Sequence, residues 1–218
     1  MKFLALSKFL LIIILPFLLF LLVLSFTGFS DSFYRGEFSR HNVLKDVPQA
    51  ASLNEKVMNF INGKSSELPK EFNEREKQHL WDVKNIIKIS KILLYALVIL
   101  FFALLAVSFS ILKISNHITN FAGKILVFGG FLTVMLAALL FFIISSDFSS
   151  AFGSFHRLFF QKETYLFDPA NEIIVSLYPE QLFMDLGTRI SKFVIAASIV
   201  ITLLGMLLLF KSKNKKNK

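Results

Sequence analysis

The sequence contains no cysteine and few helix-breaking residues, with 5 prolines and 9 glycines in 218 residues. Without cysteine the chain forms no disulfide, offers no thiolate for catalysis or metal binding, and carries no cysteine-linked lipid of its own. The sequence also lacks a P-loop, a dinucleotide-binding glycine motif and a G-x-S-x-G nucleophile elbow. These absences argue against thiol, nucleotide-dependent, redox and serine-hydrolase chemistry.

Apolar side chains are in excess, since 55% of the residues are hydrophobic and 27 of them are phenylalanine. Four stretches contain no Asp, Glu, Lys or Arg and are long enough to cross ~30 Å of hydrocarbon at ~1.5 Å per residue. They run at about residues 9–30, 92–112, 125–146 and 193–210. The sequence therefore predicts an all-α integral membrane protein, a single domain over residues 1–218 with four transmembrane helices.

The charges divide by segment, and their division predicts the orientation in the membrane. The two termini and the short middle loop hold nine lysines and no acidic residue: Lys2, Lys8, Lys113, Lys124, Lys211, Lys213, Lys215, Lys216 and Lys218. The long loops at about 31–91 and 147–192 hold all 15 acidic residues and an equal number of basic ones. This positive-inside pattern predicts cytoplasmic termini and two outward-facing loops in a bacterial plasma membrane. The net charge of +9 thus indicates an anionic lipid surface as the partner and not nucleic acid.

The first stretch also has the basic start of a signal peptide. Its apolar run is longer than a typical signal-peptide core, and Phe26-Thr27-Gly28-Phe29-Ser30 offers no Ala-x-Ala-like cleavage site. We therefore expect an uncleaved span.

The outward loops are predicted to be helical and to form a cap. We expect one short helix around Val57–Ile61, a turn at Gly63–Ser66, and a long helix from Pro69 that continues into the second span. On that helix Phe72, Glu76, His79, Val83 and Ile86 share one face. In the second loop Phe148, Phe152, Phe155 and Phe159 recur at helical spacing, which predicts a helix lying in the membrane interface.

Two of the four histidines are candidates for chemistry. His79 and His156 lie at the outer surface close to a span, whereas His41 lies in a turn-like stretch and His117 in the short middle loop. Glu76 or Asp82 is spaced to orient His79 and raise its basicity. No metal is expected, because neither an H-x-x-x-H pair nor an H-E-x-x-H element is present. Taken singly, each histidine is more readily explained by a structural role at the interface.

Two signatures resemble a known family. They are Glu74-Arg75-Glu76-x-x-His79-Leu80-x-Asp82-Val83-Lys84 and Phe155-His156-x-x-Phe159-Phe160, followed by Leu177-Tyr178-Pro179-x-x-Leu182-Phe183. In this order they resemble the bacterial four-span membrane family that includes the lipoprotein intramolecular transacylase. The resemblance implies transfer of the sn-2 acyl chain of a diacylglyceryl-cysteine to the α-amine of the same cysteine, which gives a lyso-form N-acyl lipoprotein. It also implies that His79 and His156 carry this transfer.

The chemistry of these residues fits such a transfer. The amine, of pKa ~8, must lose a proton and the departing glycerol oxygen must gain one, which two imidazoles can mediate without a cofactor. Arg157, a protonated histidine or backbone N–H groups are candidate donors to the oxyanion. We expect Phe152, Phe155, Phe159 and Phe160 to line an acyl groove. The pattern does not tell which histidine is the base, nor whether an acyl-histidine forms.

Two other functions remain open on the sequence alone. One is a different lipid acyl hydrolase or acyltransferase on the same scaffold, with a free fatty acid or a triacylated species as product. The other is a non-enzymatic membrane scaffold whose histidines are structural. Loss of lipid chemistry in histidine variants distinguishes the enzymes from the scaffold, and the identity of the product distinguishes the two enzymes.

Overall fold

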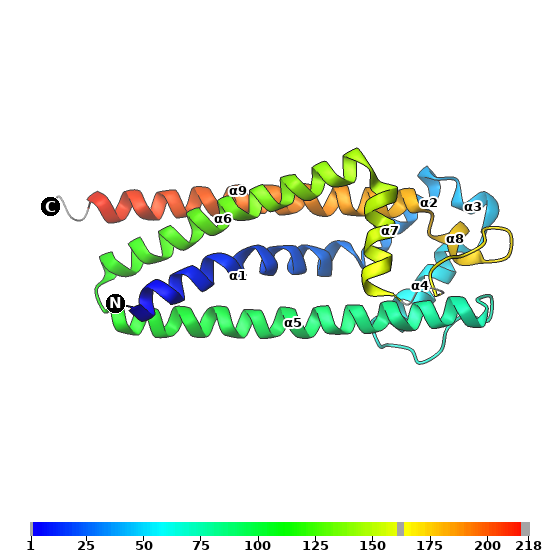
Figure 1. The fold of residues 1–218 in the computed structure, drawn as a ribbon, viewed down its shortest axis with the longest axis horizontal. Coiled ribbons are helices and arrows are strands. Elements are labelled where there is room, and N and C mark those ends of the chain that lie inside the picture. The colour runs from blue at the N-terminus through cyan, green and yellow to red at the C-terminus, as the bar shows by residue number, and fades with distance from the viewer. Residues whose placement is uncertain (1, 161–163, 215–218) are drawn as a thin grey trace. The chain divides into compact units, whose positions relative to one another are not determined.

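The computed structural model describes residues 2–160 and 164–214. In this part of the chain the elements are all helices: α1 (Lys2–Thr27), α2 (Asp31–Arg40), α3 (Val43–Asp46), α4 (Ala50–Ile61), α5 (Glu74–Leu112), α6 (Ser115–Ser146), α7 (Phe148–Phe159), α8 (Ile173–Leu177) and α9 (Glu180–Asn214) (Figure 1). The helices α1, α5, α6 and α9 are long and apolar enough to cross a membrane. The predicted all-α, four-span fold is confirmed, although residues 28–30 of the first predicted span lie beyond the end of α1.

The backbone contacts divide the chain into two compact units. Unit 1 comprises residues 1–24, 92–142 and 190–218, and unit 2 comprises residues 25–91 and 143–189. Unit 1 contains the charge-free segments, and unit 2 is built from the two loops that the sequence predicts to face outward. The helices α5 and α9 contribute residues to both units.

Unit 1 is held together by packed aliphatic and aromatic side chains. Its core joins α1, α5 and α6 through Leu11, Ile14, Leu15, Leu18, Leu19, Leu94, Phe101, Phe121 and Ile125. Helices α6 and α9 approach closely at Gly205, where a Cβ atom would lie 2.8 Å from the Val127 nitrogen. Helices in lipid gain no hydrophobic free energy by associating, so close van der Waals packing of this kind stabilises their contact instead. The start of α1, the turn between α5 and α6, and the end of α9 lie at one end of these helices (Figure 1), as the charge pattern requires.

Unit 2 has its own aromatic core, and the sequence predicted only some of the helices that build it. The expected short helix is α4, and the turn after it places Gly63 at a φ of +76° that glycine adopts without strain. Helices α2, α3 and α8 were not predicted. Tyr178 packs in this core. Its hydroxyl donates to Asn54 Oδ1 at 3.0 Å, and its ring centroid lies 6.3 Å from that of Tyr34.

The long helix of the first outer loop begins later than predicted. It runs unbroken from Glu74 to Leu112, but Pro69 to Phe72 form a turn. The reason is a capping box at Asn73. Its Oδ1 accepts from the Glu76 N–H at 2.9 Å, and Glu76 Oε2 accepts from the Asn73 N–H at 2.7 Å. This reciprocal pair satisfies two donors at the helix start and fixes the first turn there.

Candidate active site

Glu76 connects the start of α5 to α8. Its side chain is almost completely buried, with 1% of its surface exposed. One carboxylate oxygen completes the capping box, and the other, Oε1, accepts the backbone N–H of Ile174 at 2.8 Å. Because Glu76 precedes His79 by three residues, this fixed turn also fixes the direction in which His79 leaves the helix.

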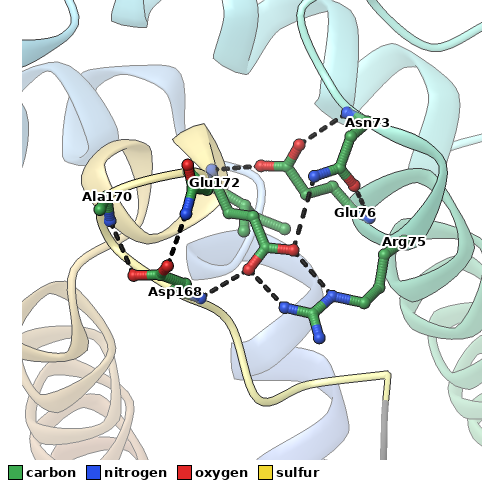
Figure 2. A network of polar contacts seen from close by, with 8 residues as sticks. Asn73, Arg75, Glu76, Asp168, Ala170 and Glu172 are labelled. Carbon is green, nitrogen blue, oxygen red and sulfur yellow. Dashed lines mark hydrogen bonds and ion pairs between the residues drawn. The ribbon is translucent and has the colours of Figure 1, made fainter.

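A second buried carboxylate, Glu172, holds the loop before α8 against the same helix turn (Figure 2). It accepts from Arg75 Nε at 2.7 Å and Nη2 at 2.5 Å, and from the backbone N–H of Asp168. The Arg75 guanidinium holds the pKa of Glu172 below its usual range, so the carboxylate stays ionised. The Asp168 carboxylate accepts in turn from the Ala170 N–H at 3.0 Å. Such paired, multiply hydrogen-bonded carboxylates make the loop rigid.

His156 comes from a different helix and has a defined tautomer. It lies near the end of α7, whose start is capped by the Asp147 side chain accepting from the Ser150 N–H at 3.0 Å. The ring nitrogen Nδ1 lies 2.8 Å from the carbonyl oxygen of Phe152. A carbonyl only accepts, so Nδ1 carries the proton and Nε2 presents a lone pair.

The structure brings the two predicted catalytic histidines together. The rings of His79 and His156 are nearly parallel, with 6.0 Å between centroids and 16° between planes. Phe160 contacts both of them, at 4.5 Å from His79 and 5.1 Å from His156. Further rings complete the surroundings, because Phe167 meets His79 edge-on at 5.3 Å and Tyr165 lies 5.3 Å from His156. The pair thus lies in an aromatic environment.

Burial keeps both imidazoles neutral at physiological pH. Only 8% of His79 is exposed, and its Nδ1 has no hydrogen-bond partner among the described residues. Burial, together with the nearby His156, lowers the pKa of His79 to about 4. Burial also lowers the pKa of His156, partly offset by the bond to Phe152 and by the charge of Glu180. Neutral imidazoles can take up a proton or donate one, as a proton-transfer site requires.

The low pKa of His79 predicts an acid-sensitive fold. The unfolded chain takes up this proton below about 6.5 and the folded chain only near 4, so the contribution of His79 to stability is present above pH 6.5 and is lost as pH falls toward 4. We expect the thermal midpoint of the detergent-solubilised protein to fall over this interval, and to fall less in a His79→Phe variant. An equal fall in both proteins would assign the acid sensitivity to other groups.

The other predicted site residues lie at the edge of this site. Asp82 Oδ1 accepts from Gln78 Nε2 at 3.4 Å, and both oxygens of Glu76 bind backbone N–H groups. In the described part of the chain neither carboxylate is hydrogen-bonded to His79. Arg157 is exposed and donates through Nη2 to Ser154 Oγ at 2.7 Å. Glu76 therefore fixes the helix turn that precedes His79 and is not itself in hydrogen-bond contact with that residue.

The four phenylalanines expected to line an acyl groove divide into two pairs. Phe152 and Phe160 are half-buried and contact His156, with Phe152 at 4.2 Å between ring centroids. Phe155 and Phe159 are 45% and 50% exposed and pack on each other at 4.8 Å, and Phe155 also lies edge-on to His156 at 5.7 Å. Helix α7 thus carries His156 and also has an exposed apolar face.

Sequence reasoning missed Arg75, Phe167 and Glu172. Arg75 belonged to a motif but had no expected partner, and the other two lie in the loop before α8, which carried no local signal. The sequence offered one further signal, for the start of α5 and not for these three residues. It is the N-x-x-E spacing of Asn73 and Glu76, which is typical of a capping box.

A separate polar cluster involves His41. Its Nε2 lies 2.9 Å from Asp185 Oδ2 and 3.2 Å from Glu37 Oε2, and Arg40 Nη1 lies 3.3 Å from each carboxylate. Burial and the neighbouring Asp185 raise the pKa of Glu37. Glu37, His41 and Asp185 offer three possible metal-ligand atoms within 4.8 Å of one another. The guanidinium of Arg40 already supplies the positive charge there, so the cluster fits an ion-pair network tying α2 to α9.

The chain is similar to known proteins along almost its whole length. Residues 9–183 match the family model of the lipoprotein intramolecular transacylase Lit. The in meso structure of the membrane-integral lipoprotein intramolecular transacylase Lit from Bacillus cereus matches with a TM-score of 0.83 at 21% identity, covering 96% of this chain and 97% of that one. Structures of that protein with one histidine replaced by arginine or alanine give TM-scores of 0.79 and 0.78 at 20% and 21% identity. They cover 97% and 96% of this chain and 94% of each of those. No curated protein sequence matches significantly.

Proposed function

Because the chain belongs to the lipoprotein intramolecular transacylase family, we propose that His79 and His156 carry its acyl transfer, from the glycerol oxygen of a diacylglyceryl-cysteine to the α-amine of that cysteine. The observation that carries the proposal is the parallel pair of neutral imidazoles, from two different helices, in one aromatic environment. The protein is a multi-pass membrane acyltransferase acting on lipoproteins.

His156 is the better candidate for the base. Its Nδ1–H is bound to the Phe152 carbonyl, so Nε2 is the atom available to take a proton from the attacking amine. The α-amine has a pKa of ~8, so at neutral pH its ammonium form first releases one proton to solvent and becomes nucleophilic. His156 then removes the second proton as the C–N bond forms, and this proton passes to the departing glycerol oxygen, so that only the first proton is released overall.

His79 is the better candidate for a neutral hydrogen-bond donor. An imidazole whose pKa is about 4 stays uncharged at pH 7 and donates one N–H. Directed at the ester carbonyl, that N–H would stabilise the tetrahedral oxyanion, an effect typically worth ~10²–10³ in rate. The alternative donor, Arg157, is bonded to Ser154 on the exposed side of α7. The unpartnered, buried Nδ1 of His79 supports a partner that the substrate supplies.

The remaining task of the enzyme is to fold the substrate headgroup. Attack closes an eight-membered ring through the amine, two cysteine carbons, sulfur, two glycerol carbons, the ester oxygen and its carbonyl carbon. Holding these atoms in place can contribute ~7–11 kcal/mol to lowering the barrier. We propose that the migrating chain lies along the apolar face of α7, where Phe155, Leu158 and Phe159 are exposed. An ester becomes an amide, so the step runs downhill without a cofactor.

The test is the identity of the product. Purified protein is incubated in micelles with a synthetic peptide bearing diacylglyceryl-cysteine at its N-terminus, and the product is fragmented in a mass spectrometer. The expected product has unchanged mass and one acyl chain on nitrogen. Release of free fatty acid alone would identify a hydrolase, and an unchanged substrate would contradict the proposal.

We also propose that the histidine pair faces outward and that both termini are cytoplasmic. The support is the placement of the lysine-rich turn and helix ends at one end of unit 1 (Figure 1), together with the positive-inside rule. Because the chain has no cysteine, single cysteines report the orientation cleanly. In intact cells an impermeant maleimide should label a Ser66→Cys variant and not a His117→Cys variant. The reverse labelling pattern would overturn the orientation.

A further inference from the structure

The inference drawn here rests on the proposed function. In any transacylase, two nucleophiles compete for the ester: the amine of the substrate and water. Attack by the amine forms the C–N bond, breaks the ester C–O bond and passes the amine proton to the glycerol oxygen. Attack by water breaks the same C–O bond but places the water oxygen on the acyl carbon, and releases a free fatty acid and the glycerol hydroxyl. An imidazole that can deprotonate the amine can also deprotonate water, so the base alone gives no selectivity.

Three aromatic residues, here named the aromatic wall, pack against the imidazoles: Phe160, Tyr165 and Phe167. Phe160 contacts both histidine rings at 4.5 and 5.1 Å. Phe167 meets His79 and Tyr165 meets His156, each at 5.3 Å. The Nδ1 atom of His79 is buried and has no hydrogen-bond partner among the described residues. Bulk water therefore does not reach this nitrogen in the substrate-free protein.

The wall is anchored by charge and not by hydrophobic contact alone. Immediately after Phe167, the Asp168 N–H donates to Glu172, which Arg75 holds through two hydrogen bonds (Figure 2). The guanidinium carbon of Arg75 also lies 5.4 Å from the centre of the Phe167 ring. The same turn of α5 that carries His79 thus holds the loop that covers it.

We propose that the aromatic wall is the specificity-determining element of the site, which makes the protein a transferase and not a hydrolase by keeping water from the ester and the two imidazoles. The amine enters already attached to the substrate and needs no path through the wall, whereas water must come from solvent. Excluding water from a closed site is a general way to suppress hydrolysis of an activated acyl group. Glu172 and Arg75 are positioning residues in this scheme, since they act through the wall.

The experiment measures how the acyl chain is partitioned between two products. Wild type, Phe160→Ala, Phe167→Ala and Glu172→Gln proteins are given the synthetic diacylglyceryl-cysteine peptide in micelles, and free fatty acid and N-acyl peptide are quantified together. We expect the ratio of free fatty acid to N-acyl product to rise about tenfold or more in the two alanine variants, and less in Glu172→Gln. Leu166→Ala is the matched control, because Leu166 lies between two wall residues but is 62% exposed; its ratio should stay at the wild-type value.

The ratio separates selectivity from folding, because a partly unfolded preparation loses both products together. Where an alanine variant yields neither product, the leucine variant at the same position keeps an apolar side chain and decides the question by its ratio. Slower variants with an unchanged ratio would overturn the wall as a selectivity element and leave it a structural role. If wild type itself forms no N-acyl product, it is the proposed function that fails.

Discussion

Alanine at His79 or at His156 is expected to reduce acyl transfer to the N-acyl product by at least about 100-fold. A positioned general base contributes ~10²–10⁴ to the rate, and an oxyanion donor ~10²–10³. The double variant should be little slower than the slower single variant, because groups that act as a unit are not additive. The measurement is the single-turnover rate on the synthetic lipopeptide, with folding checked by thermal unfolding. His117→Ala is the control, since His117 is exposed near the start of α6, and it should keep the wild-type rate.

Glutamine substitutions distinguish the two roles. A glutamine side chain donates an N–H but cannot take up a proton. His79→Gln should therefore recover part of the rate that His79→Ala loses, whereas His156→Gln should be as slow as His156→Ala. Recovery at position 156 and not at position 79 would reverse the assignment of base and donor. Full activity of both alanine variants would remove the histidines from the mechanism.

Glu76→Ala is expected to be the most damaging substitution at the edge of the site. It leaves the buried backbone N–H of Ile174 without an acceptor, at a cost of roughly 1–3 kcal/mol, and it removes the capping bond from the more exposed N–H of Asn73. We expect the free energy of unfolding to fall by about 3 kcal/mol and the transfer rate to fall with it, because the turn that directs His79 loosens. Glu76→Gln keeps the shape and one acceptor oxygen, so it should lose less. The comparison is made by thermal unfolding in one detergent.

Glu74→Ala is the control for this substitution. Glu74 lies in the same helix turn, but its side chain is 91% exposed and pairs with Lys77 at 2.8 Å. An exposed pair of this kind is worth ~0–1 kcal/mol. If Glu74→Ala and Glu76→Ala lowered the free energy of unfolding by equally small amounts, the hydrogen bond from Glu76 to α8 would not be what stabilises the site.

The spans were predictable because their physics is local. A charge-free stretch of about 20 residues crosses a membrane whatever surrounds it, and the absence of a breaker after Glu74 was enough to predict one continuous helix into the second span. The predicted start of that helix was wrong. Pro69 is compatible with a first helical turn, but the Asn73–Glu76 capping box determines where the helix begins. Helices α2, α3 and α8 were missed because tertiary contacts, and not an amphipathic pattern, stabilise such short segments.

The two histidines of the site could be predicted from the sequence, but the contacts that hold them in place could not. His79 and His156 stood out because few residue types transfer protons near neutral pH, and the resemblance to a family named the same two. Spacing offered Glu76 or Asp82 as the partner of His79, because residues three apart share a helix face. Neither carboxylate is hydrogen-bonded to His79 in the described part of the chain. The Glu76 carboxylate instead binds Ile174, a residue far away in sequence. Contacts such as Arg75 with Glu172 depend on the assembled fold, so local spacing carries no signal for them.

The most direct test of the central claim is made in cells. The chain is expressed in a bacterium that lacks the final N-acylation of lipoproteins, and the N-terminal peptide of a reporter lipoprotein is fragmented by mass spectrometry. Wild type is expected to convert the diacyl form to an isomer of equal mass with one acyl chain on the cysteine nitrogen. The His79→Ala and His156→Ala proteins, present in the membrane at equal amounts, are expected to leave the diacyl form. A reporter that stays diacylated with wild type, or is converted equally well by both variants, would contradict acyl transfer by the histidine pair.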